Sequence, residues 1–295
     1  PNTERLNAFC ERWKLKGYAD FDQMLDAEKL DLVIVASPMQ FHAPQCIAAM
    51  KAGAHAMSEV PATVSLDECW NLLATVRETG KKYMMAENYC YMRHVVLVKA
   101  MAEAGLFGEM YYAEGAYIHD VRALHKNPDG SPTWRVTWQV GRNGVTYPTH
   151  SLGPCIQWMK ERVKFLSCLG TGVHTVPSYV NEDTTVMLCK TDKNNLINIR
   201  LDMVSNRPHI MNYYSLQGTK GCYEAARAEG EPHRVWLEGY AKDRNTWQSL
   251  WDFEPEFMPE IWRNPPEEAK KAGHGGGDYF VVREFVDSIL NDTKP

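Results

Sequence analysis

Apolar positions in the first 90 residues fall in short continuous runs that are separated by helical repeats. The run Asp31–Ala36 is rich in β-branched side chains and predicts a strand buried on both faces. Shorter apolar stretches at 55–58 and 83–86 predict two further strands. The helical repeats occupy 4–15, 21–27, 43–52 and 65–78. Strands that alternate with helices are typical of a parallel, doubly wound sheet, so we expect an α/β domain here.

The pattern changes after a helix that we predict at 93–104. The segment 110–118 alternates like a half-buried strand, and a Trp-rich loop over 122–144 leads to a predicted helix at 152–160. Further strands are expected at 165–170, 184–190, 196–204 and 213–217, followed by a final helix at 279–290. Successive strands with only one or two helices among them favour an α+β domain with an open mixed or antiparallel sheet. We therefore expect domains at 1–92 and 93–278, with 279–295 packing back on the sheets.

The length, charge and cysteine content of the chain restrict the classes of function. A chain of 295 residues with net charge −5 and no long basic run is not typical of a nucleic-acid-binding protein. The eight cysteines are scattered without a C-x-x-C pair, so neither a disulfide framework nor a metal site is indicated. No apolar run reaches the roughly 20 residues of a membrane-spanning helix. The compartment is not indicated; the cytoplasm and the bacterial periplasm both remain open.

Polar residues follow the predicted parallel strands at their carboxyl ends, where such sheets bind ligands. The segment 37–42 follows the first strand directly, so we expect it to face a dinucleotide, although His42 is also compatible with local packing at a helix start. Glu59 follows the second strand and is either a cofactor contact or a solvated loop acid. The phosphate-binding motif G-x-G-x-x-G does not occur. Because the sequence opens directly in a helical pattern, we expect the first strand and that loop to be missing and both ends to be truncated.

The second half carries two groups of side chains with suitable chemistry. Tyr117 and His119 lie on the same face of a predicted strand, which also fits an ordinary half-buried surface. Tyr147 and His150 are three residues apart at a helix entry and can point into one pocket, where they would bind hydroxyl groups or move a proton; packing and capping are the alternative. No nucleophile elbow or H-E-x-x-H motif is present, so a cofactor must supply the difficult chemistry.

These segments together resemble the Gfo/Idh/MocA oxidoreductases. Residues 31–42 resemble a strand of that family and its Thr-Pro-Asn-x-x-His loop, and Glu59-Val60-Pro61 stands at its Glu-Lys-Pro signature. Within the family, the sequence is most similar to the NAD-dependent α-N-acetylgalactosaminidases, glycoside hydrolase family 109. The segments that carry this similarity are 59–62, 87–91, 105–109, 115–120, 147–150, 152–154 and 218–221. Val60 and Thr146 replace the Lys and Asp of the dehydrogenase pattern, which agrees with the glycosidase branch.

The resemblance implies a Rossmann-like domain that binds NAD and a second domain that binds a sugar. It implies cofactor contacts from Met39, Gln40, Phe41, His42, Glu59, Val60 and Asn88. It implies sugar contacts from Tyr117, Arg135, Tyr147, Pro148, Thr149 and His150, and catalytic roles for Tyr147, His150, Tyr117 and His119. In the implied reaction, sugar C3 loses hydride to NAD⁺, a base removes the C2 proton, the C1 substituent leaves, water adds and the hydride returns.

Two other functions fit the same residues. A sugar or polyol dehydrogenase of the same superfamily would use the same cofactor domain and would release NADH. A non-catalytic sensor of sugar or dinucleotide fits a chain without the glycine-rich loop. By analogy with related open sheets, we also expect the protein to form a homo-oligomer through its open sheet.

Overall fold

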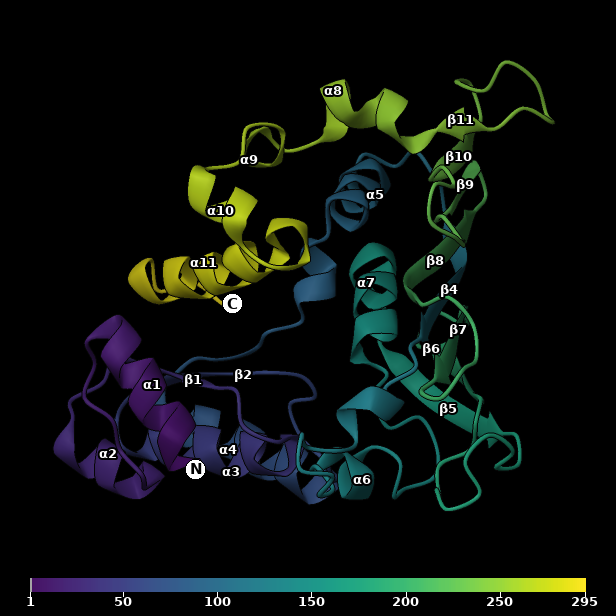
Figure 1. Cartoon of the computed structure of the whole chain (residues 1–295). Coiled ribbons are helices and arrows are strands. Elements are labelled where there is room, and N and C mark those ends of the chain that lie inside the picture. Colours follow the sequence, from purple (N-terminus) through teal and green to yellow (C-terminus); the bar gives the residue numbers. More distant parts are fainter. Residues whose placement is uncertain (1) are drawn as a thin grey trace. The chain divides into compact units, whose positions relative to one another are not determined.

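The computed structural model describes residues 2–295, and the chain forms two compact units (Figure 1). The first unit extends to Ala86 and includes Val282–Pro295, and the second unit is Glu87–Val281. One junction follows the third strand, and the other lies inside the last helix, α11 (Gly277–Leu290). The expected domain limits of 1–92 and 93–278 stay a prediction. No helix among the described residues is both long enough and apolar enough to cross a bilayer.

The first unit contains a parallel sheet of three strands in the order β1-β2-β3. The strands are β1 (Leu32–Val35), β2 (His55–Ser58) and β3 (Tyr83–Met85). Its helices are α1 (Thr3–Trp13), α2 (Phe21–Ala27), η1 (Met39–Phe41), α3 (His42–Lys51) and α4 (Leu66–Thr79). Strand and helix alternate along the chain, as the hydrophobic pattern predicts, and the parallel α/β arrangement is confirmed.

The strand β1 is buried on one face only. Val33 and Val35 pack in a cluster with Cys46 and Met50 of α3. Ile34 points to the opposite face and is 51% exposed. The expectation of a strand buried on both faces is therefore wrong for β1, because side chains alternate along a strand and α3 packs against the face that carries the two valines.

The second unit is built on an eight-stranded sheet in the order β11-β10-β9-β8-β4-β7-β6-β5. Among the described strands of this sheet, β4 and β7 form the one parallel pair, and the other neighbours are antiparallel. The strands are β4 (Met110–Ile118), β5 (Val163–Gly170), β6 (Thr185–Thr191), β7 (Leu196–Asp202), β8 (Ile210–Gly218), β9 (Gly221–Glu224), β10 (Arg234–Leu237) and β11 (Gln248–Ser249). The sequence pattern predicts β4 to β8 and misses the short strands β9 to β11.

Two helices, α5 (Arg93–Glu103) and α7 (Thr149–Met159), lie along one face of this sheet (Figure 1). Trp158 of α7 is almost fully buried and meets the rings of Tyr214 and Tyr223 edge-on. The remaining helices are η2 (Asn88–Tyr91), η3 (Arg122–Leu124), α6 (Arg135–Trp138), η4 (Leu250–Phe253), α8 (Glu254–Phe257), α9 (Glu260–Arg263), α10 (Glu267–Lys271) and η5 (His274–Gly276). Helix α7 starts three residues before the predicted segment 152–160, which places His150 in its first turn.

The core between α5 and the sheet contains a stacked pair of histidines. His94 is buried, its ring centroid lies 4.5 Å from that of His233, and its Nε2 has no hydrogen-bond partner. Burial, with a smaller contribution from the neighbouring His233, lowers the pKa of His94 to about 3. In the unfolded chain the pKa returns to about 6.5, so acid protonates the unfolded state first and destabilises the fold.

We expect the free energy of unfolding to fall as the pH drops below about 6.5. Between pH 7 and pH 5 the His94 contribution amounts to about 2 kcal/mol. His94→Phe keeps a ring in the core but removes the titration, so the variant should lose less stability over this range. Urea unfolding at the two pH values measures the difference. An equal loss in the variant and the native protein would contradict the assignment to His94.

Candidate functional site

The loops at the carboxyl ends of β1 and β2 are tied together by one histidine. His42 is buried, with Nδ1 2.7 Å from the Pro61 carbonyl oxygen and Nε2 2.7 Å from that of Ser37. His42 therefore fixes the loop after β1 against the loop after β2. Both ring nitrogens are occupied by backbone, so its part in a cofactor site would be to shape these loops.

The other predicted cofactor residues of the first unit lie in the same loops. Met39 and Val60 are buried, Phe41 and Glu59 are exposed, and Glu59 accepts a hydrogen bond from the Val60 amide at 3.3 Å. Gln40 has a buried Oε1 atom without a hydrogen-bond partner. Such an atom is costly to bury unless a donor reaches it, and a bound polar ligand provides one.

In the second unit, the end of β4 brings a tyrosine and a histidine together. The Tyr117 hydroxyl lies 2.8 Å from Nδ1 of His119. Burial raises the pKa of Tyr117 to about 12, against the opposing effect of the Arg135 guanidinium. Burial, His209 and Arg135 lower the pKa of His119. The phenol therefore stays protonated at neutral pH and donates to a neutral imidazole.

A buried carboxylate holds His150 in place. Its Nδ1 lies 2.7 Å from Oε1 of Glu87, and both side chains are less than a tenth exposed. The ring stacks on Tyr89 at a centroid distance of 3.9 Å and an interplanar angle of 12°. Glu87 also accepts the Tyr89 amide N–H at 3.1 Å, which fixes the start of η2. With Nδ1 engaged, Nε2 is the nitrogen through which His150 can exchange a proton.

The start of α7 and the end of β4 contribute side chains to one aromatic cluster. The Tyr117 ring lies 5.7 Å from that of Tyr147 and 5.4 Å from that of His150. Tyr147 meets His150 edge-on at 5.1 Å. The structure thus brings together the two pairs that the sequence analysis treated separately.

Two glycines permit this close approach. A Cβ atom on Gly115 of β4 would lie 2.5 Å from the backbone oxygen of Ser151 in α7. On the other side of α7, a Cβ atom on Gly153 would lie 2.9 Å from Glu87 Cγ. Any larger residue would push α7 away from β4 or from Glu87, so these glycines set the position of His150.

The remaining predicted residues of this unit surround the cluster less directly. Arg135 is half-buried, donates to Gln139 Oε1 at 2.9 Å and lies over the Trp134 ring. Pro148 precedes α7, and Thr149 has a buried hydroxyl without a partner. Asn88, predicted as a cofactor contact, belongs to the second unit and donates to Asp278 Oδ1 at 2.7 Å.

Three residues that contact the cluster, Glu87, Tyr89 and His209, have no role predicted from the sequence. Glu87 and Tyr89 stand only within the similar segment 87–91, and His209 carries no prediction. The His209 ring lies 4.6 Å from that of His119 and reaches it from the segment before β8. Glu87 follows a parallel strand by two residues, and this position could have indicated a site residue. Nothing in the local sequence indicates a role for His209.

Comparison with protein families identifies both parts of the chain. Residues 1–87 match the oxidoreductase family with an NAD-binding Rossmann fold, and residues 91–183 and 171–295 match the C-terminal domain of glycosyl hydrolase 109. The chain belongs to the glycosyl hydrolase 109 family. The Rossmann assignment of the first part and the Gfo/Idh/MocA relationship are thereby confirmed.

Curated members of family 109 are similar over most of this chain. A glycosyl hydrolase family 109 protein of Shewanella pealeana is 33% identical over 298 residues, covering 92% of this chain and 63% of that protein. A protein of Shewanella oneidensis named alpha-N-acetylgalactosaminidase is 31% identical, with the same two coverages. The chain thus spans somewhat less than two thirds of the length of these relatives.

Solved structures share the fold at lower identity. Levoglucosan dehydrogenase in complex with NADH and L-sorbose superposes with a TM-score of 0.83 at 18% identity, over 100% of this chain and 80% of that one. An NAD-binding oxidoreductase from Klebsiella pneumoniae gives a TM-score of 0.80 at 18% identity, over 99% and 79% of the two chains. The chain therefore shares the fold of these structures.

Proposed function

We propose that the protein is an NAD-dependent glycosidase that acts on α-N-acetylgalactosaminides. The observation that carries this proposal is the Glu87–His150 pair, which gives a buried imidazole a fixed orientation beside Tyr117 and Tyr147. Membership of family 109 and the relative named alpha-N-acetylgalactosaminidase support the substrate. Paired carboxylates are the usual signature of glycosidases, and NAD-dependent families are the exception to it.

The loops of the first unit suit a dinucleotide. Gln40 offers a buried, unpartnered oxygen, and Met39, Phe41, His42, Glu59 and Val60 share the carboxyl edge of the parallel sheet, where such ligands bind. These residues would hold NAD, which when bound supplies reversible hydride removal from sugar C3 and so acidifies the C2 proton.

In this proposal His150 is the base that removes the C2 proton. Glu87 accepts from Nδ1 and keeps that nitrogen protonated, so Nε2 presents a lone pair. Stacking on Tyr89 prevents the ring from turning. The same Nε2 returns the proton to C2 after the C1 substituent has left and water has added at C1.

Tyr117 and His119 would handle the hydroxyl proton at C3. The Tyr117 oxygen accepts the sugar hydroxyl proton while its own proton passes to His119 Nδ1, which lies 2.8 Å away. The half-buried Arg135 guanidinium, whose charge acts on both groups, favours the negative charge that develops on the sugar oxygen. Tyr147, Pro148 and Thr149 would complete the sugar pocket at the start of α7.

A sugar dehydrogenase is the alternative, and two positions argue against it. Val60 is buried and apolar where the dehydrogenase pattern has Lys, and Thr146 stands in place of its Asp. Neither residue can exchange a proton as Lys and Asp do, so the proton carriers of the dehydrogenase pattern are missing at these two positions.

The proposal is tested with p-nitrophenyl α-N-acetylgalactosaminide and NAD⁺, following nitrophenol and NADH together. We expect nitrophenol release without accumulating NADH, because the hydride returns in each turnover. NADH formation from free sugars without nitrophenol would replace the glycosidase by a dehydrogenase. Ligand binding without either product would favour a sensor.

We also propose that the protein forms a homo-oligomer through its open sheet. Phe165, Leu166 and Leu169 of the edge strand β5 are about two thirds exposed or more, an unusual density of apolar side chains at a sheet edge. Leu166→Glu combined with Leu169→Glu should yield monomers in light scattering coupled to gel filtration. A native protein that is already monomeric would refute this proposal.

A further inference from the structure

A cavity lies on the other side of the eight-stranded sheet from α7. Its volume is about 690 Å³, within the range of small-molecule binding sites. Tyr223 of β9 points towards Trp158 of α7, so its neighbour Cys222 points to the opposite face. The cavity lies beneath the connection between β10 and β11 and is lined by Cys222, Trp236, Arg244, Asn245 and Trp247.

The connection is held in a defined conformation. Asp243 accepts hydrogen bonds from the Asn245 amide at 2.8 Å and from the Thr246 hydroxyl at 2.9 Å. The Trp236 indole N–H donates to the Asp243 carbonyl oxygen at 2.9 Å, which fixes the ring and the loop together. The Trp236 ring and the backbone of the connection are therefore positioned before any ligand binds.

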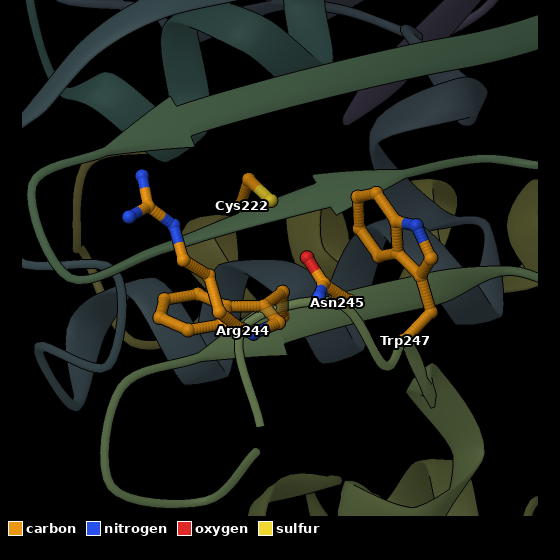
Figure 2. Close-up of a pocket in the computed structure, with 5 residues that line it drawn as sticks. Cys222, Arg244, Asn245 and Trp247 are labelled. Atoms are coloured by element: carbon orange, nitrogen blue, oxygen red, sulfur yellow. The ribbon is translucent and has the colours of Figure 1, made fainter. Parts of the chain in front are cut away.

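The lining side chains combine flat apolar surfaces with planar hydrogen-bonding groups. Figure 2 shows Arg244 and Trp247 on opposite sides, with Asn245 and Cys222 between them. Trp247 is 44% exposed, and the Arg234 guanidinium lies 5.6 Å from its ring centroid. Burial raises the pKa of the Cys222 thiol, so this group is a neutral part of the wall.

We propose that this cavity binds a saccharide, as a non-catalytic site separate from the Glu87–His150 cluster. A pyranose presents an apolar C–H face, which packs on an indole, and a rim of hydroxyl groups that both accept and donate hydrogen bonds. Arg244 supplies donors, and Asn245 supplies a donor and an acceptor. A large anion is a poorer match, because the lining has one cationic side chain beside two indoles. A purely apolar ligand is also a poorer match, because it would leave the Arg244 guanidinium and the Asn245 amide without hydrogen-bond partners.

The inference goes beyond the proposed function and does not depend on it. None of the lining residues belongs to the aromatic cluster on the α7 side. A saccharide held here would keep a glycan or an oligosaccharide near the enzyme whichever reaction the other site performs.

The test uses lactose, maltose and N,N′-diacetylchitobiose, which carry no α-N-acetylgalactosaminide terminus. Saturation-transfer NMR and titration should reveal binding of at least one of them in the roughly millimolar range expected of small polar ligands. Trp247→Ala should weaken that binding at least tenfold. Trp70→Ala, which removes an indole that is 68% exposed on α4, should leave it unchanged.

Three outcomes would overturn the proposal. Two of these are no binding of any of the three disaccharides and unchanged binding by a folded Trp247→Ala variant. Gel filtration of Trp247→Ala adds a separate criterion. If this substitution converts a dimer into monomers, the cavity is closed by a second copy of the chain and is not a saccharide site. Asn245→Ala, with both indoles in place, should weaken binding by a smaller factor.

Discussion

Replacing His150 by Ala should lower kcat for p-nitrophenyl α-N-acetylgalactosaminide about 10²–10⁴-fold, the usual contribution of a general base. The Nδ1 atom of this imidazole is anchored by the buried carboxylate of Glu87, which leaves Nε2 for proton transfer. Removal of the imidazole leaves the aromatic walls of the site in place, so KM should change much less than kcat. Initial rates of nitrophenol release over a range of substrate concentrations separate the two parameters.

The companion variant Glu87→Gln examines how the histidine is positioned. Gln keeps an oxygen near Nδ1 but loses the charge, so we expect an intermediate loss of about 10–100-fold. His174→Ala, an exposed histidine of the same unit, is the control and should retain native activity. If His150→Ala folds normally and keeps more than a tenth of the native kcat, the C2 base is another residue.

Gly115→Ala should damage activity and stability together, although this residue carries no functional group. Its new Cβ would meet the Ser151 backbone oxygen at 2.5 Å, about 1 Å closer than ordinary contact. Helix α7 must move away from β4, and His150 moves with it relative to Tyr117. A misplacement of this size costs about 10²-fold in rate, and the overpacking costs about 1–3 kcal/mol in the free energy of unfolding.

The matched control for Gly115→Ala is Gly172→Ala. There the added methyl group meets only the His174 side chain, at 3.1 Å in an exposed loop, and that ring can turn aside. Thermal unfolding and nitrophenol assays on both variants provide the comparison. Native activity in Gly115→Ala would show that the spacing between α7 and β4 does not set the geometry of the site.

The sequence predicts the elements of the first unit well because each has a strong local signal. The Ser65 side chain accepts the Glu68 amide N–H and so begins α4, and Gly80 ends that helix with a φ of 65°. The run at β1 was assigned correctly as a strand but wrongly as buried on both faces. A strand's burial depends on what packs against it, which the local pattern does not contain.

The second unit shows a different limit. Alternation correctly placed Tyr117 beside His119, whereas the pairing of β4 with β7 and β8 depends on contacts distant in sequence. The short strands β9 to β11 carry too few residues for a periodic signal, so the cavity beneath their connection was not predictable. The hydrogen bond between Glu87 and His150 joins residues 63 positions apart, and no local motif encodes it.

The location of Glu87 and Tyr89 limits how this protein can be recombined with its relatives. Both residues stand within four positions of the end of β3, yet both belong to the site of the second unit. A hybrid that takes residues 1–86 from a relative and the rest from this protein would keep His150 together with Glu87 and Tyr89. A hybrid with the junction after residue 92 would instead place His150 beside the relative's residues at positions 87 and 89. Exchange of the first unit for that of a relative would therefore keep both partners of His150 only when the crossover falls before Glu87.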